Sequence, residues 1–335
     1  MSDPRPRGDL PVRPYRPPSS DLLAALTPFG RYGVELETPL APHTSFRIGG
    51  PAAALLTINR LAHLEAALDT LHSHKTPFLL LGGGSNVLIS DAGVPGVVIL
   101  NQCRQIQWPQ DDAEPLLVQV EAGASLAGLS RAAIQRGLAG LAWAVSIPGT
   151  VGGAIVGNAG AHGGCIADVL YSVQLWEDGR VSVVPASQLQ FEYRSSSLKR
   201  PTDQSAPGPV VLSATFRLRP DPAGAEAQRA QSYIAHRRRT QPVDKSAGSI
   251  FKNPPGDYAG RLIEAAGLKG LRVGQVSVSA LHANFIVTHG QATAAEVVQL
   301  MNLMRRRVYE RFGVILEPEI QFIGDWSAGP SLRKT

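Results

Sequence analysis

Two glycine-rich segments carry the clearest chemical signal in the sequence. The first, Gly82-Gly83-Gly84-Ser85-Asn86, directly follows the apolar run 78–81. The second extends from Ile147-Pro148-Gly149-Thr150-Val151-Gly152-Gly153-Ala154 to Gly157-Asn158-Ala159-Gly160. Glycine permits positive φ and lets backbone N–H groups approach a ligand closely, and consecutive N–H groups form concave sites for anions such as a diphosphate. Two such segments, each beside an apolar strand, favour a dinucleotide cofactor held at both ends over plain turns.

The spacing of these glycines argues against the two commonest nucleotide-binding motifs. No G-x-G-x-x-G sequence lies between an expected strand and helix, so a Rossmann nicotinamide site is not supported. No G-x-x-x-x-G-K-[ST] sequence occurs, so a P-loop is not supported either.

Three further segments, 191–197, 247–254 and 316–320, combine polar side chains with a tight backbone. They contain Arg194, Ser249 and Glu319. Taken singly, each residue has a plain alternative: a surface ion pair for Arg194, an ordinary turn serine for Ser249, and an exposed edge charge for Glu319. Ser249 also lacks the G-x-S-x-G frame of a nucleophile elbow, so an acid or hydrogen-bonding role suits it better than acyl transfer.

The bulk properties indicate an ordered protein of two or three domains. The chain has 335 residues, of which 44% are hydrophobic and 18% charged. No apolar run reaches membrane-spanning length, so we expect no membrane insertion. The only cysteines, Cys103 and Cys165, suggest neither a disulfide framework nor a zinc site, and a reducing cytoplasm is the default. The net charge of +5 permits nucleic-acid binding, but no helix-turn-helix or RNP-like motif supports it.

The first two expected modules follow a Pro/Arg-rich start, residues 1–20, that we expect to be disordered. In the first module, 21–91, a helix is predicted by leucine periodicity and leads to a strand at 78–81. In the second module, 92–222, Ser125 is expected to cap a helix running towards Gly137. Asp178-Gly179 predicts a hairpin. The periodic leucines are Leu61, Leu64, Leu68 and Leu71; the strands expected in the second module are 97–100, 117–120, 173–176, 181–184 and 210–218; residues 220–222 read as a linker.

The third expected module, 223–324, is mainly marked by helix caps. Asp257 is expected to cap a helix that ends at Gly267. Thr293 and Glu296 form a capping box, and Gly313 is expected to end the helix that they begin. The apolar face of that helix contains Val297, Leu300, Met301, Met304 and Val308, and its solvated face Arg305, Arg306, Arg307 and Arg311. Residues 325–335 are expected to form a flexible tail.

The order of the motifs resembles the UDP-N-acetylenolpyruvoylglucosamine reductase family. The matching segments are 44–50, 81–88, 147–160, 193–194, 248–254 and 316–319, which span almost the whole chain except both tails. The resemblance implies an α+β fold: a two-domain FAD-binding unit of the vanillyl-alcohol-oxidase type and a C-terminal α+β domain for the UDP-sugar. The short stretch between Arg194 and Ser249 shows no tyrosine-bearing flap and is similar to the type II subgroup.

The resemblance also implies residue roles. Catalytic roles fall to Arg194, Ser249 and Glu319, substrate orientation to Lys252 and Asn253, and no metal is expected. Arg237, Arg238 and Arg239 could reach the UDP diphosphate or form a solvated helix end. The implied FAD-binding residues, with FAD held non-covalently, are Arg47, Gly82, Gly83, Gly84, Ser85, Asn86, Ile147, Pro148, Gly149, Thr150, Gly152, Gly153, Asn158, Ala159 and Gly160.

The implied reaction has two halves. NADPH reduces FAD, and after NADP leaves, UDP-N-acetylglucosamine enolpyruvate takes a hydride from flavin N5 at its C3. Arg194, with Glu319 as a protonated hydrogen-bond donor, would stabilise the enolate-like intermediate. Ser249 would protonate C2 to give UDP-N-acetylmuramate for peptidoglycan synthesis. A cytoplasmic monomer is expected.

The sequence departs from the usual family pattern at His43, Val156-Gly157 and His162, near the expected flavin pocket. Two alternatives stay open. One is a sugar or alcohol oxidase of the same fold, with FAD attached covalently at His162. The other is a catalytically inactive nucleotide- or RNA-binding protein, which the intact set of Arg194, Ser249 and Glu319 disfavours.

Overall fold

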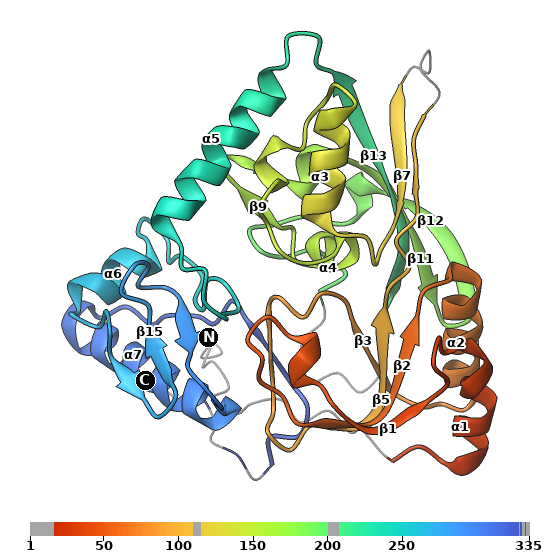
Figure 1. Cartoon of the computed structure of the whole chain (residues 1–335), viewed down its shortest axis with the longest axis horizontal. Helices are drawn as coiled ribbons and strands as arrows, with labels where there is room; N and C mark the ends of the chain where they lie inside the picture. The colour runs from red at the N-terminus through yellow and green to blue at the C-terminus, as the bar shows by residue number, and fades with distance from the viewer. Residues whose placement is uncertain (1–16, 110–114, 200–207, 328, 330–331, 333–335) are drawn as a thin grey trace, which may run out of the picture.

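The computed structural model describes residues 17–109, 115–199, 208–327, 329 and 332. Two strand-rich bodies lie on the right of Figure 1, one above the other. A helical body lies on the left, and the long helix α5, Ala225–Thr240, leads from the upper body to it. The predicted tails fall mostly outside the described residues, although helix α1 already begins at Ser20.

The lower body is a four-stranded sheet of order β1-β2-β5-β3, in which β1 is antiparallel to β2 and the other pairs are parallel. Helices α1 and α2 share an apolar core with this sheet. Leu64, Leu68 and Leu71 are fully buried there, as their periodicity predicts. The elements are α1 Ser20–Leu26, β1 Glu35–Pro39, β2 Pro51–Ile58, α2 Leu61–Ser73, β3 Phe78–Leu81 and β5 Val94–Asn101.

This pairing bears on the boundary expected between residues 91 and 92. The strand expected at 97–100 exists within β5, but β5 pairs with β2 and β3 of the first sheet. A boundary after Asn101 therefore fits the sheet better. Short-range patterns predict that a strand exists, whereas its partners are decided by tertiary packing.

The upper body is an antiparallel sheet of order β12-β11-β13-β7-β6. The predicted hairpin is confirmed: β11 and β12 meet at Asp178 and Gly179, both with positive φ. Ser125 caps α3, as predicted. The elements are β6 Ile106–Gln107, β7 Leu116–Glu121, α3 Leu126–Gln135, β8 Leu138–Ala139, α4 Val151–Val156, β9 Gly160–Ala161, β10 Gly164–Cys165, β11 Leu170–Glu177, β12 Arg180–Pro185 and β13 Val210–Pro220.

The expected linker at 220–222 is shorter than predicted. Pro220 still belongs to β13, where it pairs with Leu138 of β8. The Asp221 carboxylate accepts hydrogen bonds from the N–H groups of Ala225 and Glu226, so it already belongs to the start of α5.

The helical body packs α6 and α7 with a small antiparallel sheet, β14-β15-β16, around one apolar core. The predicted capping box of Thr293 and Glu296 begins α7, and Gly313 ends it with φ of 67°. The five predicted apolar residues of α7 are all buried. The elements are α6 Ala259–Ala265, β14 Arg272–Val273, β15 Val276–Val278, β16 Ile286–Thr288 and α7 Ala294–Phe312.

Two predictions in this body are wrong. Asp257 does not cap α6: the N-cap is Tyr258, and the side-chain oxygen of Asn253 accepts the Ala259 N–H at 3.1 Å. Asp257 instead pairs with Arg261 one turn along. Arg305 is not solvated, because it is buried and its Nε donates to the Leu316 carbonyl at 3.0 Å.

The chain returns to the lower body at its C-terminal end. Strand β17, Gln321–Ile323, pairs in parallel with β4, Val87–Ile89, which follows the first glycine segment. The Asp91 carboxylate also accepts the N–H groups of Ala294 and Ala295 at the start of α7. The lower and helical bodies are thus joined beside the first glycine segment. Among the described helices, none combines the length and the apolar character needed to cross a bilayer.

Candidate active site

The first glycine segment needs its glycines because other parts of the chain lie directly against it. A Cβ on Gly82 would stand 2.4 Å from Thr150 Oγ1, and one on Gly83 would stand 3.0 Å from the Cα of Gly149. Gly84 has φ of +57°, and its Cβ would overlap the carbonyl of His43. These glycines therefore let two loops approach each other, in addition to any approach to a ligand.

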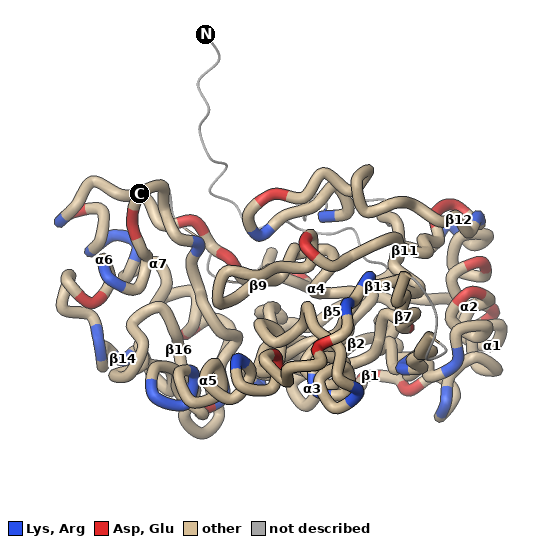
Figure 2. Tube along the Cα trace, turned by 90° about the horizontal axis from the view of Figure 1, so that it is seen from above, with Lys and Arg blue, Asp and Glu red and all other residues tan. Residues whose placement is uncertain are grey.

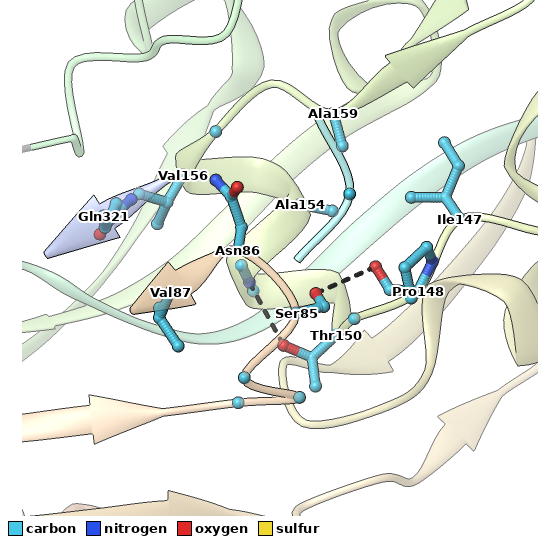
Figure 3. A pocket seen from close by; sticks show the side chains of 18 of the residues that line it. Ser85, Asn86, Val87, Ile147, Pro148, Thr150, Ala154, Val156, Ala159 and Gln321 are labelled. Carbon is cyan, nitrogen blue, oxygen red and sulfur yellow. Dashed lines mark hydrogen bonds between the residues drawn. The ribbon is translucent and has the colours of Figure 1, made fainter. Parts of the chain in front are cut away.

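The second glycine segment meets the first from the other side. Gly149 has φ of +113°, and a Cβ there would lie 2.6 Å from Ser85 Oγ. The Ser85 hydroxyl donates to the Pro148 carbonyl at 3.2 Å, and Figure 3 shows this bond linking the two loops. Thr150 caps α4, with its Oγ1 accepting the Gly153 N–H. The two segments form one continuous surface.

This surface lines a cavity of about 640 Å³, within the roughly 300–1,000 Å³ of small-molecule and cofactor sites. Within the described part of the chain, the N–H groups of Gly83, Gly84 and Ser85 donate no hydrogen bond. Gly153 and Gly157 line the cavity with no protein atom closer than 3.5 Å to an added Cβ. Free donors and open glycines suit a diphosphate-bearing cofactor such as FAD.

Arg194 and Glu319 form an ion pair in the wall of the same cavity. Arg194 Nε lies 2.7 Å from Glu319 Oε1, with 26% of the Arg194 side chain and 14% of the Glu319 side chain exposed. A second guanidinium nitrogen donates to the Gly160 carbonyl at 3.1 Å, which ties Arg194 to the end of the second glycine segment. Arg194 itself adopts φ of +56°, an uncommon conformation for a residue with a side chain.

Glu319 is held by the first glycine segment and by the segment that carries Ser249. The side-chain amide of Asn86 donates to the Glu319 carbonyl at 3.2 Å. The Glu319 N–H donates to the Ile250 carbonyl at 2.8 Å, so residues 249–251 and 317–319 run side by side. Ser249 lines the cavity, and its hydroxyl bonds to no described residue. The structure thus brings all three predicted catalytic residues to one cavity.

Burial and charge act in opposite directions on the Glu319 carboxyl. Burial raises its pKa above the ordinary value, while Arg194, Lys199 and Lys252 act to lower it. The net direction is upward, because desolvation of a carboxylate outweighs the neighbouring cations here. Glu319 is therefore easier to protonate than an ordinary glutamate.

Most of the predicted FAD-binding residues line the cavity, but Arg47 and Asn158 do not. The Arg47 guanidinium donates to the Pro42 carbonyl. Asn158 is buried: its amide donates to the Glu192 carbonyl at 2.9 Å and its oxygen accepts the Ala167 N–H at 3.2 Å. The predicted residues that do line it are Gly82, Gly83, Gly84, Ser85, Asn86, Ile147, Pro148, Gly149, Thr150, Gly152, Gly153, Ala159 and Gly160.

The two predicted substrate residues also lie outside the cavity lining. Lys252 pairs with Glu317, and the Asn253 side-chain oxygen accepts a hydrogen bond at the start of α6. Arg237 does line the cavity, at the basic end of α5 marked blue in Figure 2, whereas Arg238 and Arg239 are exposed.

The residues at which the sequence departs from the family pattern also surround this cavity. His162 lines it and stacks on Tyr233 of α5 with ring centroids 4.0 Å apart. Val156 and Gly157 line it as well, whereas His43 contributes only the carbonyl beside Gly84.

Several lining residues were not singled out from the sequence, among them Lys199, His236, Phe285 and Gln321. Two of them stand close to a predicted catalytic residue. Lys199 follows Arg194 by five residues, and Gln321 follows Glu319 by two. Their nearness in sequence to a predicted catalytic residue could have identified Lys199 and Gln321 as site residues. His236 and Phe285 offered no such signal, because only the tertiary fold brings them to the cavity.

Two family models match separate parts of the chain. An FAD-binding domain matches residues 52–183, and the C-terminal domain of UDP-N-acetylenolpyruvoylglucosamine reductase matches residues 241–323. A reductase of that name from Chloroflexus aggregans is 45% identical over 291 residues, covering 85% of this chain and 96% of the relative. One from Rubrobacter xylanophilus is 43% identical, covering 87% and 95%. The chain belongs to the UDP-N-acetylenolpyruvoylglucosamine reductase family.

A solved structure agrees with this assignment. The crystal structure of the reductase from Thermus caldophilus matches with a TM-score of 0.71 at 37% identity, covering 86% of this chain and 97% of that one. The expected fold class is confirmed, and the chain is a flavin-dependent oxidoreductase. The free N–H groups and open glycines described above fit the FAD that this assignment requires.

Gly149→Ala should sharply reduce FAD retention. The added methyl would meet Ser85 Oγ at 2.6 Å, and φ of +113° is strained for alanine, at a cost of about 1–3 kcal/mol. Flavin absorbance per polypeptide after gel filtration would measure the loss. Gly260→Ala is a matched control, because its Cβ would find only ordinary contacts, 3.5 Å and beyond, outside the cavity. Equal FAD retention by both variants would contradict the importance of the contact between the loops.

Proposed function

We propose that this chain catalyses the NADPH-dependent, FAD-mediated reduction of UDP-N-acetylglucosamine enolpyruvate to UDP-N-acetylmuramate, in peptidoglycan precursor synthesis. The observation that supports this most is the placement of Ser249 and the Arg194–Glu319 pair on the cavity that both glycine segments line. The names of the relatives, at 43–45% identity, point to the same substrate.

The glycine segments would hold the cofactor. The free N–H groups of Gly83, Gly84 and Ser85 are suited to its diphosphate. When bound, FAD supplies the redox chemistry, accepting electrons from NADPH and delivering them to C3 of the enolpyruvyl group. The protein's part is to orient the reactants and to manage charge and protons.

Arg194 would stabilise the charge that develops on the substrate. Reduction at C3 places extra negative charge on the enolpyruvyl carboxylate, and a pre-positioned cation lowers the energy of that enolate-like state. Glu319 and the Gly160 carbonyl hold the guanidinium in the cavity wall, so its position is set before the substrate arrives. Glu319, in its protonated form, would donate a second hydrogen bond to the same carboxylate.

Ser249 would supply the proton that C2 requires. Ser249 lines the cavity, and its hydroxyl bonds to no described residue, so its proton is available. Serine is a weak acid, but an enolate is basic enough to accept the proton. This assigns proton delivery to Ser249 and charge stabilisation to Arg194 and Glu319.

The modules of the chain would divide the binding of cofactor and substrate between them. The modules up to residue 222 would hold FAD through the set predicted above, in which Arg47 and Asn158 act indirectly by holding loops. Residues 223–324 would hold the UDP-sugar, with Arg237 facing the diphosphate and Lys252 and Asn253 orienting the substrate. We further propose a cytoplasmic monomer.

The function can be tested optically under anaerobic conditions. NADPH should bleach the flavin band of the purified protein, and UDP-N-acetylglucosamine enolpyruvate should restore it. Bleaching without return would reject this substrate while keeping a flavoenzyme. Absence of a flavin band even after FAD is added would reject the proposal entirely.

Ser249→Ala should separate the two half-reactions. Bleaching by NADPH should stay near the wild-type rate, because no proton is delivered to carbon in that step. Reoxidation by the enolpyruvyl substrate should slow by about 10²- to 10⁴-fold, the usual contribution of a positioned acid. Stopped-flow absorbance would measure both steps, and an equal loss in the two would point to a structural role instead.

The second half-reaction should depend on pH through Glu319. A protonated carboxyl is fully present below its pKa and is lost as pH rises through it, so the reoxidation rate should fall with rising pH. Burial places this fall at a higher pH than an ordinary glutamate would give. Glu319→Gln should retain FAD and lose this dependence, because its amide stays neutral. A wild-type rate that increases with pH over this range would assign the active form to the carboxylate.

A further inference from the structure

Lys199 stands at the cavity wall and bonds to the backbone of Arg194. Its ammonium donates to the Arg194 carbonyl at 2.8 Å, and its side chain lines the cavity. It reaches back over five residues of chain to do so. The bond therefore fixes the backbone of Arg194, which among the three predicted catalytic residues is the one with a positive φ.

The strain at Arg194 needs an anchor. Arg194 sits in a tight turn that is closed by reciprocal backbone hydrogen bonds between Glu192 and Ser195. Its φ of +56° lies in the left-handed region, which residues with a Cβ occupy only when their surroundings enforce it. The guanidinium contacts to Glu319 and Gly160 hold the tip of the side chain, and Lys199 holds the backbone.

Lys199 also belongs to a cluster in which positive side chains outnumber negative ones. Three cations, Arg194, Lys199 and Lys252, lie near two carboxylates, Glu317 and Glu319. Arg194 pairs with Glu319 and Lys252 with Glu317. Within the described chain, Lys199 is the cation of this set that forms no ion pair. While both carboxylates are ionised, one positive charge is left over, which matches one incoming carboxylate.

Burying the Lys199 ammonium against a carbonyl, in place of a carboxylate, is energetically unfavourable, so we expect it to serve a function at the site. Burial and the nearby cations Lys252 and Arg194 lower the pKa of the Lys199 ammonium, while Glu319 and Glu317 raise it. A purely structural lysine would gain more from a carboxylate partner than from a carbonyl. Perturbed ionisable groups of this kind gather at functional sites.

We propose that Lys199 is a positioning residue for the second half-reaction: it holds Arg194 in its left-handed conformation, aimed at the substrate carboxylate, and supplies the unpaired positive charge beside Glu319. The inference rests on the proposed function. Lys199 acts through Arg194 and through the local potential, and takes no part in the transfer of electrons or protons.

Lys199→Met tests this, with Lys199→Arg as rescue and Lys269→Met as matched control. Lys269 is a half-buried lysine that contacts Glu264 away from the cavity. Lys199→Met should bind FAD and be bleached by NADPH within about threefold of wild type, while reoxidation by substrate slows by about 10- to 100-fold, the range for loss of a charged hydrogen bond. Lys199→Arg should recover most of the rate, and Lys269→Met should match wild type.

The pH profile distinguishes positioning from a general loss of structure. Lys199 acts to lower the pKa of Glu319, together with Arg194 and Lys252. Removing Lys199 should therefore shift the fall in reoxidation rate to a higher pH. A merely structural defect would lower the rate and leave the pH of the fall unchanged. In Lys199→Arg the position of the fall should be that of wild type.

Two results would overturn the inference. One is wild-type reoxidation kinetics in Lys199→Met. The other is loss of FAD from both Lys199→Met and Lys199→Gln, which would assign the lysine to the framework of the cavity. Failure of the proposed function would give a different result. In that case the enolpyruvyl substrate would not reoxidise even the wild-type enzyme.

Discussion

The contact between two glycine loops is the constraint on which the rest of the site depends. Gly83 and Gly149 approach so closely that a Cβ on the first would stand 3.0 Å from the Cα of the second. Each loop belongs to a different body of the fold, so this approach sets how the two sheets meet. Within the described residues, the N–H groups of Gly83, Gly84 and Ser85 in the first loop donate no hydrogen bond. A side chain at Gly83 or Gly149 would separate the loops and widen the cavity that they form.

The Arg194–Glu319 pair depends on that contact because each partner is held by one of the loops. The Gly160 carbonyl, at the end of the second glycine segment, accepts from Arg194, while Asn86, at the end of the first, donates to the Glu319 carbonyl. The ion pair therefore closes a ring that runs through both glycine segments. On either side of Glu319 in the chain, the Leu316 carbonyl accepts a hydrogen bond from Arg305 and β17 pairs with β4, so the segment that carries Glu319 is anchored at both ends. Movement of either loop would change the geometry of the pair.

Local patterns predicted several of the helices and strands and the two glycine segments of the cavity, but not the partners of individual groups. The Leu64–Leu71 periodicity, the Asp178-Gly179 hairpin and the Thr293–Glu296 capping box depend on short-range chemistry, and the structure confirms them. Arg305 and Asp257 were misassigned because a charged side chain chooses between solvent and a distant partner, which spacing does not reveal. The pairing of β5 with β2 and β3, like the place of His236 and Phe285 in the cavity, follows from tertiary packing alone. Motif order located Arg194, Ser249 and Glu319 because a resemblance over the whole chain carries three-dimensional information that single residues lack.

The electrostatics explain why a buried salt bridge suits this site better than an isolated cation. A lone arginine in the cavity wall would bear the full cost of desolvation, whereas Glu319 offsets part of it and fixes the direction of the guanidinium. The same burial raises the pKa of Glu319, so the carboxyl can take up a proton when a second carboxylate arrives and competes for Arg194. Protonation would then release Arg194 to the substrate without leaving a buried anion unpaired. Within the described chain, Lys199 donates to a carbonyl and forms no ion pair, and together with Arg194 and Lys252 it limits how far that pKa rises. These three cations therefore help to set the pH range in which the exchange of partners can occur.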